Sequence, residues 1–258
     1  LHGVPAMFNA ILACPEVRQC DLSSLREIII AGAPPPLALI QQLERIAPCR
    51  ALTAYGLTET ILLTVSRPKS YLAASEPESH RLRRQASAGT PILGVDVRVV
   101  APDMREVARD GQAVGEVVAR GNVVMDGYFR DPEATAEAMA DDWFHTGDLA
   151  VVDDEGYLTI VDRKKDMIIS GGENISSIEV ETVLAGHPAV SDCAVIGVPD
   201  EQWGEAPLAM IVLRAGISAT DGEFIAHCRE RLAGFKIPKQ FVFVETLPKG
   251  CLLYTSDA

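Results

Sequence analysis

Several patterns that would point directly to a function are missing from this chain of 258 residues. No apolar run reaches the roughly 18–20 residues that a transmembrane helix needs, because prolines interrupt the most apolar early stretch, residues 28–40. The six cysteines form no CxxC pair, and no histidine stands at the spacing of a zinc ligand. These absences argue against a membrane-spanning helix and a zinc site. Cysteines scattered in this way are typical of a reducing compartment, so we predict a cytoplasmic protein.

Basic residues are also scarce. The chain has 23 Lys and Arg against 36 Asp and Glu, which gives a formal net charge of -13. Broad nucleic-acid binding needs clustered positive charge, so we expect no nucleic-acid partner. The tightest basic run, residues 81–84, stands among Pro, Ser and Glu residues. We interpret it as a solvated part of a loop that covers residues 67–91.

The two common nucleotide-binding fingerprints, GxxxxGK[ST] and GxGxxG, are absent too, so a nucleotide would have to be held in another way. What is present is a mixture of strand and helix signals. Residues 95–99 alternate with period two, which predicts a strand. Asp131, followed by Pro132, is a plausible helix N-cap, and capping boxes begin at Ser176 and Thr220. The fold class is therefore predicted to be α/β.

Three segments carry residue types that suit a nucleotide: residues 55–60 (YGLTET), 143–148 (WFHTGD) and 162–174 (DRKKDMIISGGEN). A tyrosine ring can stack on a base. A threonine hydroxyl can bond a phosphate, and a glutamate carboxylate is a hard oxygen ligand for Mg²⁺. An aspartate can accept hydrogen bonds from ribose hydroxyls, and an arginine can reach ribose or phosphate oxygens.

In this order and spacing, the three segments resemble the adenylate-forming superfamily of acyl-CoA synthetases, luciferases and nonribosomal adenylation domains, most closely its fatty-acyl-CoA ligase branch. The resemblance implies that residues 1–162 are the end of the large adenylating domain, including a strand-rich subdomain. Residues 163–250 would be the small mobile α/β C-terminal domain. The family's Ser/Thr/Gly-rich phosphate loop is absent, so we expect the large domain to be truncated at its N-terminus. Residues 251–258 match nothing in the family and are expected to be a non-native tail.

The resemblance also implies a site that binds ATP together with a magnesium ion. Its positions are Gly32, Ala33 and Pro34 against the adenine, Tyr55 stacked on it, Thr58 on phosphate, Glu59 on Mg²⁺, Asp148 on the ribose hydroxyls, and Arg163 in support of them. Thr58 and Glu59 are the implied catalytic positions.

For CoA, the resemblance implies that Gly171 and Gly172 line a pantetheine tunnel. Lys165 matches the hinge about which the C-terminal domain rotates. Further positions that some acyl-CoA ligases use for CoA are matched by Trp203, Phe235, Lys236 and Lys239. By contrast, His145 has no obvious carboxylate partner in the sequence, and we interpret it as structural.

The implied reaction joins a small-molecule carboxylate to CoA through an acyl-adenylate and releases pyrophosphate and AMP. The family's catalytic lysine is missing, because no lysine follows residues 247–250, and the context of Lys249 does not fit that role. We therefore expect this chain alone to adenylate poorly or not at all. Two alternatives stay open: an adenylating enzyme that loads a carrier protein, and a non-catalytic nucleotide-binding protein.

Overall fold

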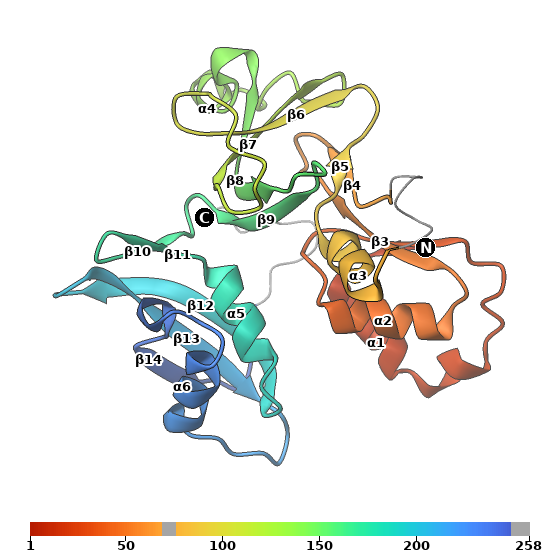
Figure 1. Ribbon diagram of the computed structural model, residues 1–258, viewed down its shortest axis with the longest axis vertical. Helices are drawn as coiled ribbons and strands as arrows, with labels where there is room; N and C mark the ends of the chain where they lie inside the picture. Colours follow the sequence, from red (N-terminus) through yellow and green to blue (C-terminus); the bar gives the residue numbers. More distant parts are fainter. Residues whose placement is uncertain (69–75, 249–258) are drawn as a thin grey trace. The chain divides into compact units, whose positions relative to one another are not determined.

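The computed structural model describes residues 1–68 and 76–248 (Figure 1). The chain divides into two compact units, the first covering Leu1–Val161 and the second beginning at Asp162. The predicted domain boundary lies one residue further on. Lys249, Gly250 and the tail predicted for residues 251–258 lie outside the described residues. None of the helices in the two described ranges combines the length and the apolar character needed to cross a membrane.

The first sheet of the first unit has five strands in the order β1-β2-β3-β4-β5. They are β1 (His2–Gly3), β2 (Glu27–Ile30), β3 (Arg50–Tyr55), β4 (Thr64–Val65) and β5 (Thr90–Pro91). Strands β1, β2 and β3 are parallel, and β4 and β5 continue the sheet antiparallel.

Helices α1 (Pro5–Ala13) and α2 (Leu37–Ile46) bury their apolar faces in the core beside β2 and β3. In the sequence, residues 37–46 carry apolar residues at helical spacing, which predicts a helix, and α2 has these bounds. Ile40 and Leu43 are buried in that core together with Ile30, the last residue of β2. A short 3-10 helix (Pro15–Gln19) follows α1.

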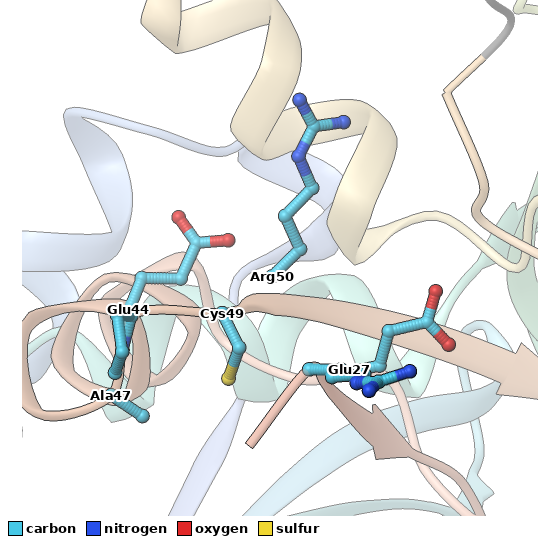
Figure 2. A pocket seen from close by; sticks show the side chains of 7 residues that line it. Glu27, Glu44, Ala47, Cys49 and Arg50 are labelled. Carbon is cyan, nitrogen blue, oxygen red and sulfur yellow. The ribbon is translucent and has the colours of Figure 1, made fainter. Parts of the chain in front are cut away.

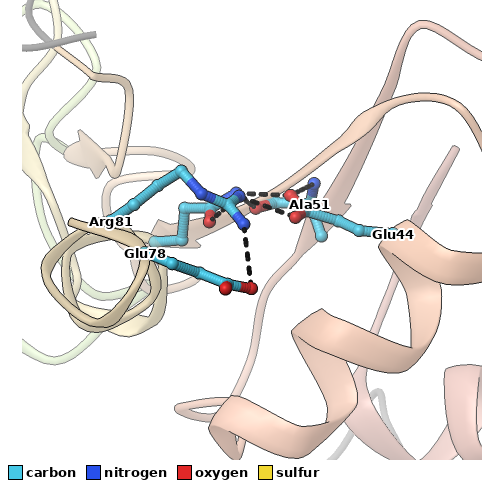
Figure 3. A network of polar contacts seen from close by, with 5 residues as sticks. Glu44, Ala51, Glu78 and Arg81 are labelled. Carbon is cyan, nitrogen blue, oxygen red and sulfur yellow. Dashed lines mark hydrogen bonds and ion pairs between the residues drawn. The ribbon is translucent and has the colours of Figure 1, made fainter. Parts of the chain in front are cut away.

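The prediction that residues 67–91 form a loop was wrong, because Glu78–Ala86 is a helix, α3. The basic run within it is not a solvated segment. Leu82 is buried in the core, and Arg81 Nη1 donates to Glu44 Oε2 on α2 at 2.7 Å, as Figure 3 shows. Arg84 is bonded in the same way to Glu76 Oε2, at 2.9 Å. The arginines therefore fix α3 to the rest of the unit, since Arg81 bonds Glu44 of α2 and Arg84 also bonds Glu155, 71 positions away.

The strand-rich part of the first unit is a four-stranded sheet in the order β6-β7-β8-β9. The strands are β6 (Val95–Val100), β7 (Gly115–Gly121), β8 (Phe144–Val152) and β9 (Leu158–Arg163), whose last two residues already belong to the second unit. Between β7 and β8 lie α4 (Pro132–Ala138) and a short 3-10 helix (Ala140–Asp142). The predicted N-cap is confirmed, since Asp131 Oδ1 accepts the backbone N–H of Ala134 at 3.0 Å.

The second unit is built on one sheet in the order β11-β10-β13-β12, with β14 parallel to β13. Its strands are β10 (Ile168–Ser170), β11 (Glu173–Ile175), β12 (Val190–Asp200), β13 (Gly204–Leu213) and β14 (Gln240–Phe243). Its helices are α5 (Ser177–Ala185), α6 (Asp221–Arg229) and a short 3-10 turn (Gly234–Lys236).

The two α-helices of this unit begin where their caps predicted. The reciprocal capping box of Thr220 and Glu223 is present at α6, and at α5 the side chain of Ser176 accepts the N–H of Glu179 at 3.1 Å. The unit has a hydrophobic core of its own, in which Leu184 of α5 and Phe224 of α6 are fully buried. Both units mix helices with sheets, which confirms the α/β fold class.

Candidate functional site

The turn after β2, which contains one glycine and then three prolines, and the end of β3 lie at the same edge of the first sheet. Ile30 pairs with Thr53 across the two parallel strands, so Gly32 lies level with Tyr55. Residues 32–34 are exposed, and Gly32 has a φ of +82°, which favours glycine. Ligands of open α/β sheets bind outside the carboxyl ends of the parallel strands. The predicted adenine segment and Tyr55 therefore meet at an accessible edge of the expected kind.

Tyr55 and Asp148, two predicted ATP residues 93 positions apart, are joined directly. The phenolic O–H of Tyr55 donates to Asp148 Oδ2 at 2.7 Å. Asp148 lies on β8 with only 7% of its surface exposed, and the Tyr55 side chain packs against the core of the strand-rich sheet. The hydrogen bond thus connects the two sheets of the first unit. A carboxylate has several acceptor positions, so one phenol does not exhaust its capacity for ligand hydroxyls.

The backbone folds back on itself immediately after Tyr55. A Cβ at Gly56 would lie 2.4 Å from the carbonyl oxygen of Ile61, so only glycine fits there. The side chain of Thr60, fully buried, accepts the N–H of Leu57 at 3.0 Å and fixes the turn. Thr58 is exposed at this turn, where a phosphate could reach its hydroxyl.

Glu59 is held by a segment that the sequence reasoning did not identify. The hydroxyl of Tyr128 donates to Glu59 Oε1 at 3.0 Å, and the N–H of Met125 donates to the carbonyl oxygen of Glu59 at 2.8 Å. Nowhere in the described ranges do three His, Cys, Asp or Glu side chains gather as a metal site. Mg²⁺ is commonly bound by one or two carboxylates together with substrate phosphates and water, and a single Glu59 carboxylate fits that arrangement.

His145 does have a carboxylate partner, which local sequence could not indicate. Its Nδ1 lies 3.2 Å from Glu116 Oε2, and Glu116 Oε1 accepts the N–H of Gly147 at 3.3 Å. Glu116 stands on β7 and the other two residues on β8, so only the pairing of these strands reveals the contact.

Two predicted residues, Arg163 and Lys165, belong to the second unit. The N–H of Arg163 donates to the side chain of the buried Asp162 at 2.8 Å, and Asp162 also accepts the N–H of Ser177 at the start of α5. Lys165 is exposed in the turn that follows β9. The predicted hinge residue therefore follows a buried aspartate that anchors the beginning of this unit.

Gly171 and Trp203, both predicted CoA positions, are in contact. The N–H of Gly171 donates to the carbonyl oxygen of Trp203 at 2.8 Å. A Cβ at Gly171 would lie 2.6 Å from Cε3 of the indole, and the residue has a φ of +61°. Gly172 also has a positive φ, +87°, but open space where a Cβ would stand. The indole is 44% exposed and offers a flat apolar surface beside these glycines.

The remaining predicted CoA residues lie elsewhere in the second unit. Phe235 and Lys236 are in the short 3-10 turn, where Lys236 Nζ bonds Glu179 Oε2 at 2.6 Å and lies 5.8 Å from the centre of the Phe235 ring. Lys239 is exposed, and its N–H donates to the carbonyl oxygen of Pro207 at 2.9 Å. The predicted CoA positions therefore form one group after β10 and another around the residues that lead into β14.

A hollow in the first unit lies away from these residues. Figure 2 shows it near Glu27 and Arg50, the first residues of β2 and β3, with Glu44 and Cys49 beside them. Candidate nucleotide residues lie at the opposite, carboxyl ends of the same strands. Burial raises the pKa of the Cys49 thiol, so the reactive thiolate is disfavoured at neutral pH. Neither the place nor the chemistry of this hollow suits the predicted site.

Comparison with known proteins extends the same pattern over nearly the whole chain. Residues 1–129 match the family described as AMP-binding enzyme, and residues 179–250 match the AMP-binding enzyme C-terminal domain. The chain is 45% identical to a feruloyl-CoA synthase of Amycolatopsis sp over 251 residues, 96% of this chain and 48% of the relative. It is 43% identical to a 2-methylpropanoate–CoA ligase of Humulus lupulus over 255 residues, 96% of this chain and 45% of the relative.

Among solved structures, the chain is similar to the o-succinylbenzoate CoA synthetase of Bacillus subtilis in complex with its acyl-adenylate intermediate. The TM-score is 0.80 and the identity 33%, over 96% of this chain and 48% of the synthetase. The same synthetase in complex with ATP and a magnesium ion gives a TM-score of 0.78 at 33% identity and the same coverage. The chain spans about half the length of the curated relatives that it matches. On the matches to both domains, the chain belongs to the AMP-binding enzyme family.

Proposed function

We propose that the protein containing this chain is an AMP-forming acid–thiol ligase. A carboxylate attacks the α-phosphate of ATP and releases pyrophosphate, and the CoA thiol then attacks the acyl-adenylate and releases AMP. The observation that carries the proposal is the 2.7 Å hydrogen bond between Tyr55 and Asp148, which joins two family motifs at the carboxyl edge of the parallel strands. The names of the relatives, which are CoA ligases, support it.

In the adenylating step, this chain contributes the surface that holds the nucleotide. Residues 32–34 offer an exposed backbone turn against which a base can lie, with the ring of Tyr55 beside it. The Asp148 carboxylate accepts hydrogen bonds from the ribose hydroxyls, and the exposed Thr58 hydroxyl meets a phosphate. Because Asp148 is buried and already accepts the Tyr55 hydroxyl, it does not have to be desolvated or reoriented when ATP binds.

Glu59 is the residue that would hold the magnesium ion. When bound, the ion supplies positive charge at the phosphate oxygens on which negative charge develops. The chain's own contribution is to fix the carboxylate: Tyr128 bonds one of its oxygens and Met125 its backbone.

In the thioester-forming step, we propose that the second unit binds CoA. The Gly171–Trp203 contact provides an apolar surface beside a backbone without side chains, which suits a narrow pantetheine arm. Lys236 and Lys239 offer positive charge for the CoA phosphates, and Phe235 offers a ring for its adenine. We further propose that Arg163 supports the ribose of ATP. Lys165 is proposed as the hinge about which the C-terminal domain rotates between the two steps.

For the acyl group we propose a fatty acid or a related carboxylate. The relatives named above are a feruloyl-CoA synthase and a 2-methylpropanoate–CoA ligase, so aromatic and short branched acids both belong in a substrate panel.

The test is AMP release by the whole protein that contains this chain, with ATP, Mg²⁺ and a panel of carboxylic acids, in the presence and absence of CoA. We expect release that requires both an acid and CoA. Adenylate formation without CoA-dependent turnover would point to a carrier-protein thiol as the acceptor, and no ATP consumption with any acid would leave a non-catalytic nucleotide-binding protein. The 258-residue chain alone is the matched control, for which we expect no turnover.

A further inference from the structure

The pairing of β7 with β8 is irregular at the place where Asp148 leaves the sheet. Glu116 pairs with Leu149 and Val118 pairs with His145, so the single residue Val117 faces residues 146–148. Bulges of this kind bend one strand and change the direction of a side chain, and they are frequent next to active sites. The bulge makes Asp148 the last of the extra residues before regular pairing resumes.

The bulge is closed internally by Thr146. Its hydroxyl donates to the carbonyl oxygen of Val117 at 2.8 Å and accepts the N–H of Asp148 at 3.1 Å. Gly147, between them, has a φ of +70°, a backbone conformation that a residue with a side chain rarely adopts. The threonine attaches the first residue of the bulge to β7, and the middle of the bulge needs a separate attachment.

Glu116 makes that attachment with both carboxylate oxygens. Oε1 accepts the N–H of Gly147 at 3.3 Å, and Oε2 lies 3.2 Å from Nδ1 of His145, which must carry the proton in this contact because the carboxylate can only accept. The Glu116 side chain is only 14% exposed, so these bonds are made largely out of solvent. The Nε2 atom of His145 is buried and has no partner within the described part of the chain, so the Glu116 contact is what fixes the orientation of this ring.

We propose that Glu116 is a positioning residue for Asp148. It holds His145, immediately before the bulge, and Gly147, at the centre of the bulge, and so fixes the direction in which the Asp148 carboxylate meets the ribose hydroxyls of ATP. The inference rests on the proposed function, since it concerns the same site. The physical reason is that a hydrogen bond weakens steeply outside a narrow range of distance and angle, so an acceptor serves its ligand only when it is held in the right direction.

The test is a double-mutant cycle in the whole protein, with the dissociation constant of ATP measured by titration calorimetry. We expect Glu116→Ala and Asp148→Asn each to weaken ATP binding by about tenfold, and the double variant to be no weaker than Asp148→Asn alone. A second readout is discrimination between ATP and 2′,3′-dideoxy-ATP, which lacks the ribose hydroxyls. Glu116→Ala should discriminate less than the unmodified protein, because a misdirected Asp148 no longer recognises those hydroxyls.

The matched control is Glu106→Ala. Glu106 belongs to the same unit but pairs with the exposed Arg98 and Arg109, so its loss should leave ATP affinity and discrimination unchanged. If Glu116→Ala fails to fold, Glu116→Gln takes its place, since its amide oxygen can still accept one of the two N–H groups. Unchanged affinity and discrimination in the Glu116 variant, or losses that simply add in the double variant, would overturn the inference. Absence of ATP binding by the unmodified protein would instead overturn the proposed function, and the inference with it.

Discussion

At the scale of single residues, the hydrogen bond between Tyr55 and Asp148 serves the fold and the candidate site together. A buried carboxylate is costly unless donors compensate for its lost hydration. Tyr55 provides such a donor at 2.7 Å, from a strand of the other sheet. The residue proposed to lie against the adenine therefore also stabilises the residue proposed to bind the ribose.

Tyr55→Phe tests this dual role. Removing the hydroxyl should lower the free energy of unfolding by about 1.5–3 kcal/mol, the scale for hydrogen bonds to charged groups, and should raise the KM for ATP. Tyr157→Phe is the matched control, because the Tyr157 hydroxyl donates to the carbonyl oxygen of Arg67 at 2.8 Å in the same unit. This control should lower the free energy of unfolding but leave the KM for ATP unchanged. Urea denaturation and initial rates measure the two quantities, and equal changes in the KM for ATP would contradict a specific role for Tyr55.

Gly171→Ala tests the proposed CoA surface. The positive φ of this residue costs a residue with a side chain about 1–2 kcal/mol, and the new Cβ would displace the Trp203 indole. We expect a higher KM for CoA and a shifted tryptophan emission. Gly172→Ala carries a similar backbone cost with no atom in the way, so its KM for CoA should change little. An equal effect of both substitutions on that KM would remove the Gly171–Trp203 contact from the CoA site.

Residues of the candidate site could be predicted only where they stand in a continuous motif. Tyr55 and Asp148 did, and the structure brings them together. Glu116 and Tyr128 could not be found in this way, because each stands in an ordinary local sequence and meets its partner only through strand pairing or a distant turn. The distinction follows the hydrogen bonds: the motifs contain the groups proposed to face a ligand, whereas the residues that hold those groups are placed by tertiary contact.

At the scale of elements, α3 shows where pattern reasoning failed. The helices α2 and α4 were predicted from apolar spacing and an N-cap, both of which are local signals. Within α3, the only buried residues are Leu82 and Gln85, and Gln85 donates to Glu44 on α2 at 2.6 Å. A helix whose buried face is largely polar shows no apolar stripe, so its stability depends on partners that the local sequence does not contain.

Arg84→Ala tests the attachment of α3. Arg84 is 10% exposed and bonds Glu76, which is 9% exposed, as well as Glu155 at 2.6 Å. Its removal leaves buried negative charge without compensation, so the free energy of unfolding should fall by about 3–5 kcal/mol. Arg83→Ala, one position earlier in the same helix and exposed, should cost much less. Chemical denaturation of both variants measures the two losses, and equal losses would show that the buried ion pairs of Arg84 do not set the effect.

The contact between α5 and β12 contains a carboxyl group with an unusual titration. Burial, and then the negative charges of Asp162, Asp192 and Asp166, raise the pKa of Glu181 from 4.5 to about 7, although the side chain accepts the N–H of Val195. The folded state therefore holds this proton more tightly than the unfolded state. Stability from this group is complete below pH 4.5 and is lost as the pH rises through about 7.

Glu181→Gln should remove the loss of stability at high pH, because glutamine does not ionise, while its amide oxygen can still accept the N–H of Val195. We expect the variant to be more stable than the unmodified protein at pH 8, by about 1–2 kcal/mol once partial access of solvent is allowed for, and equally stable near pH 4.5, where Glu181 is itself protonated. Guanidinium unfolding followed from pH 4.5 to 8 measures this difference. A difference that does not depend on pH would mean that packing, not ionisation, is responsible.

At the scale of the whole molecule, each unit has its own core. That of the second unit includes buried residues from both of its helices and from strands β10 to β13. Those residues come from a continuous stretch of chain, and the pairings of β10 with β11, of β13 with β10 and β12, and of β14 with β13 all lie within it. The second unit should thus not need the first in order to fold.

Residues 162–248 expressed alone test this expectation. We expect a single cooperative transition on heating, with the near-ultraviolet circular dichroism of packed aromatic side chains. A fragment with helical content but no cooperative transition would show that the core of this unit requires contacts from outside it.

Gly56 has a practical consequence for anyone who wishes to alter the acyl or nucleotide preference by random mutagenesis. Its Cβ position is occupied by backbone of the same turn, 2.4 Å from the carbonyl oxygen of Ile61 and 2.8 Å from Cα of Leu62, so no neighbouring side chain can move aside to compensate. The exposed Thr58, two positions later, has no such restriction. Substitutions at position 56 will therefore disrupt the turn itself, whereas substitutions at position 58 keep the backbone and test only the proposed contact between the Thr58 hydroxyl and a phosphate.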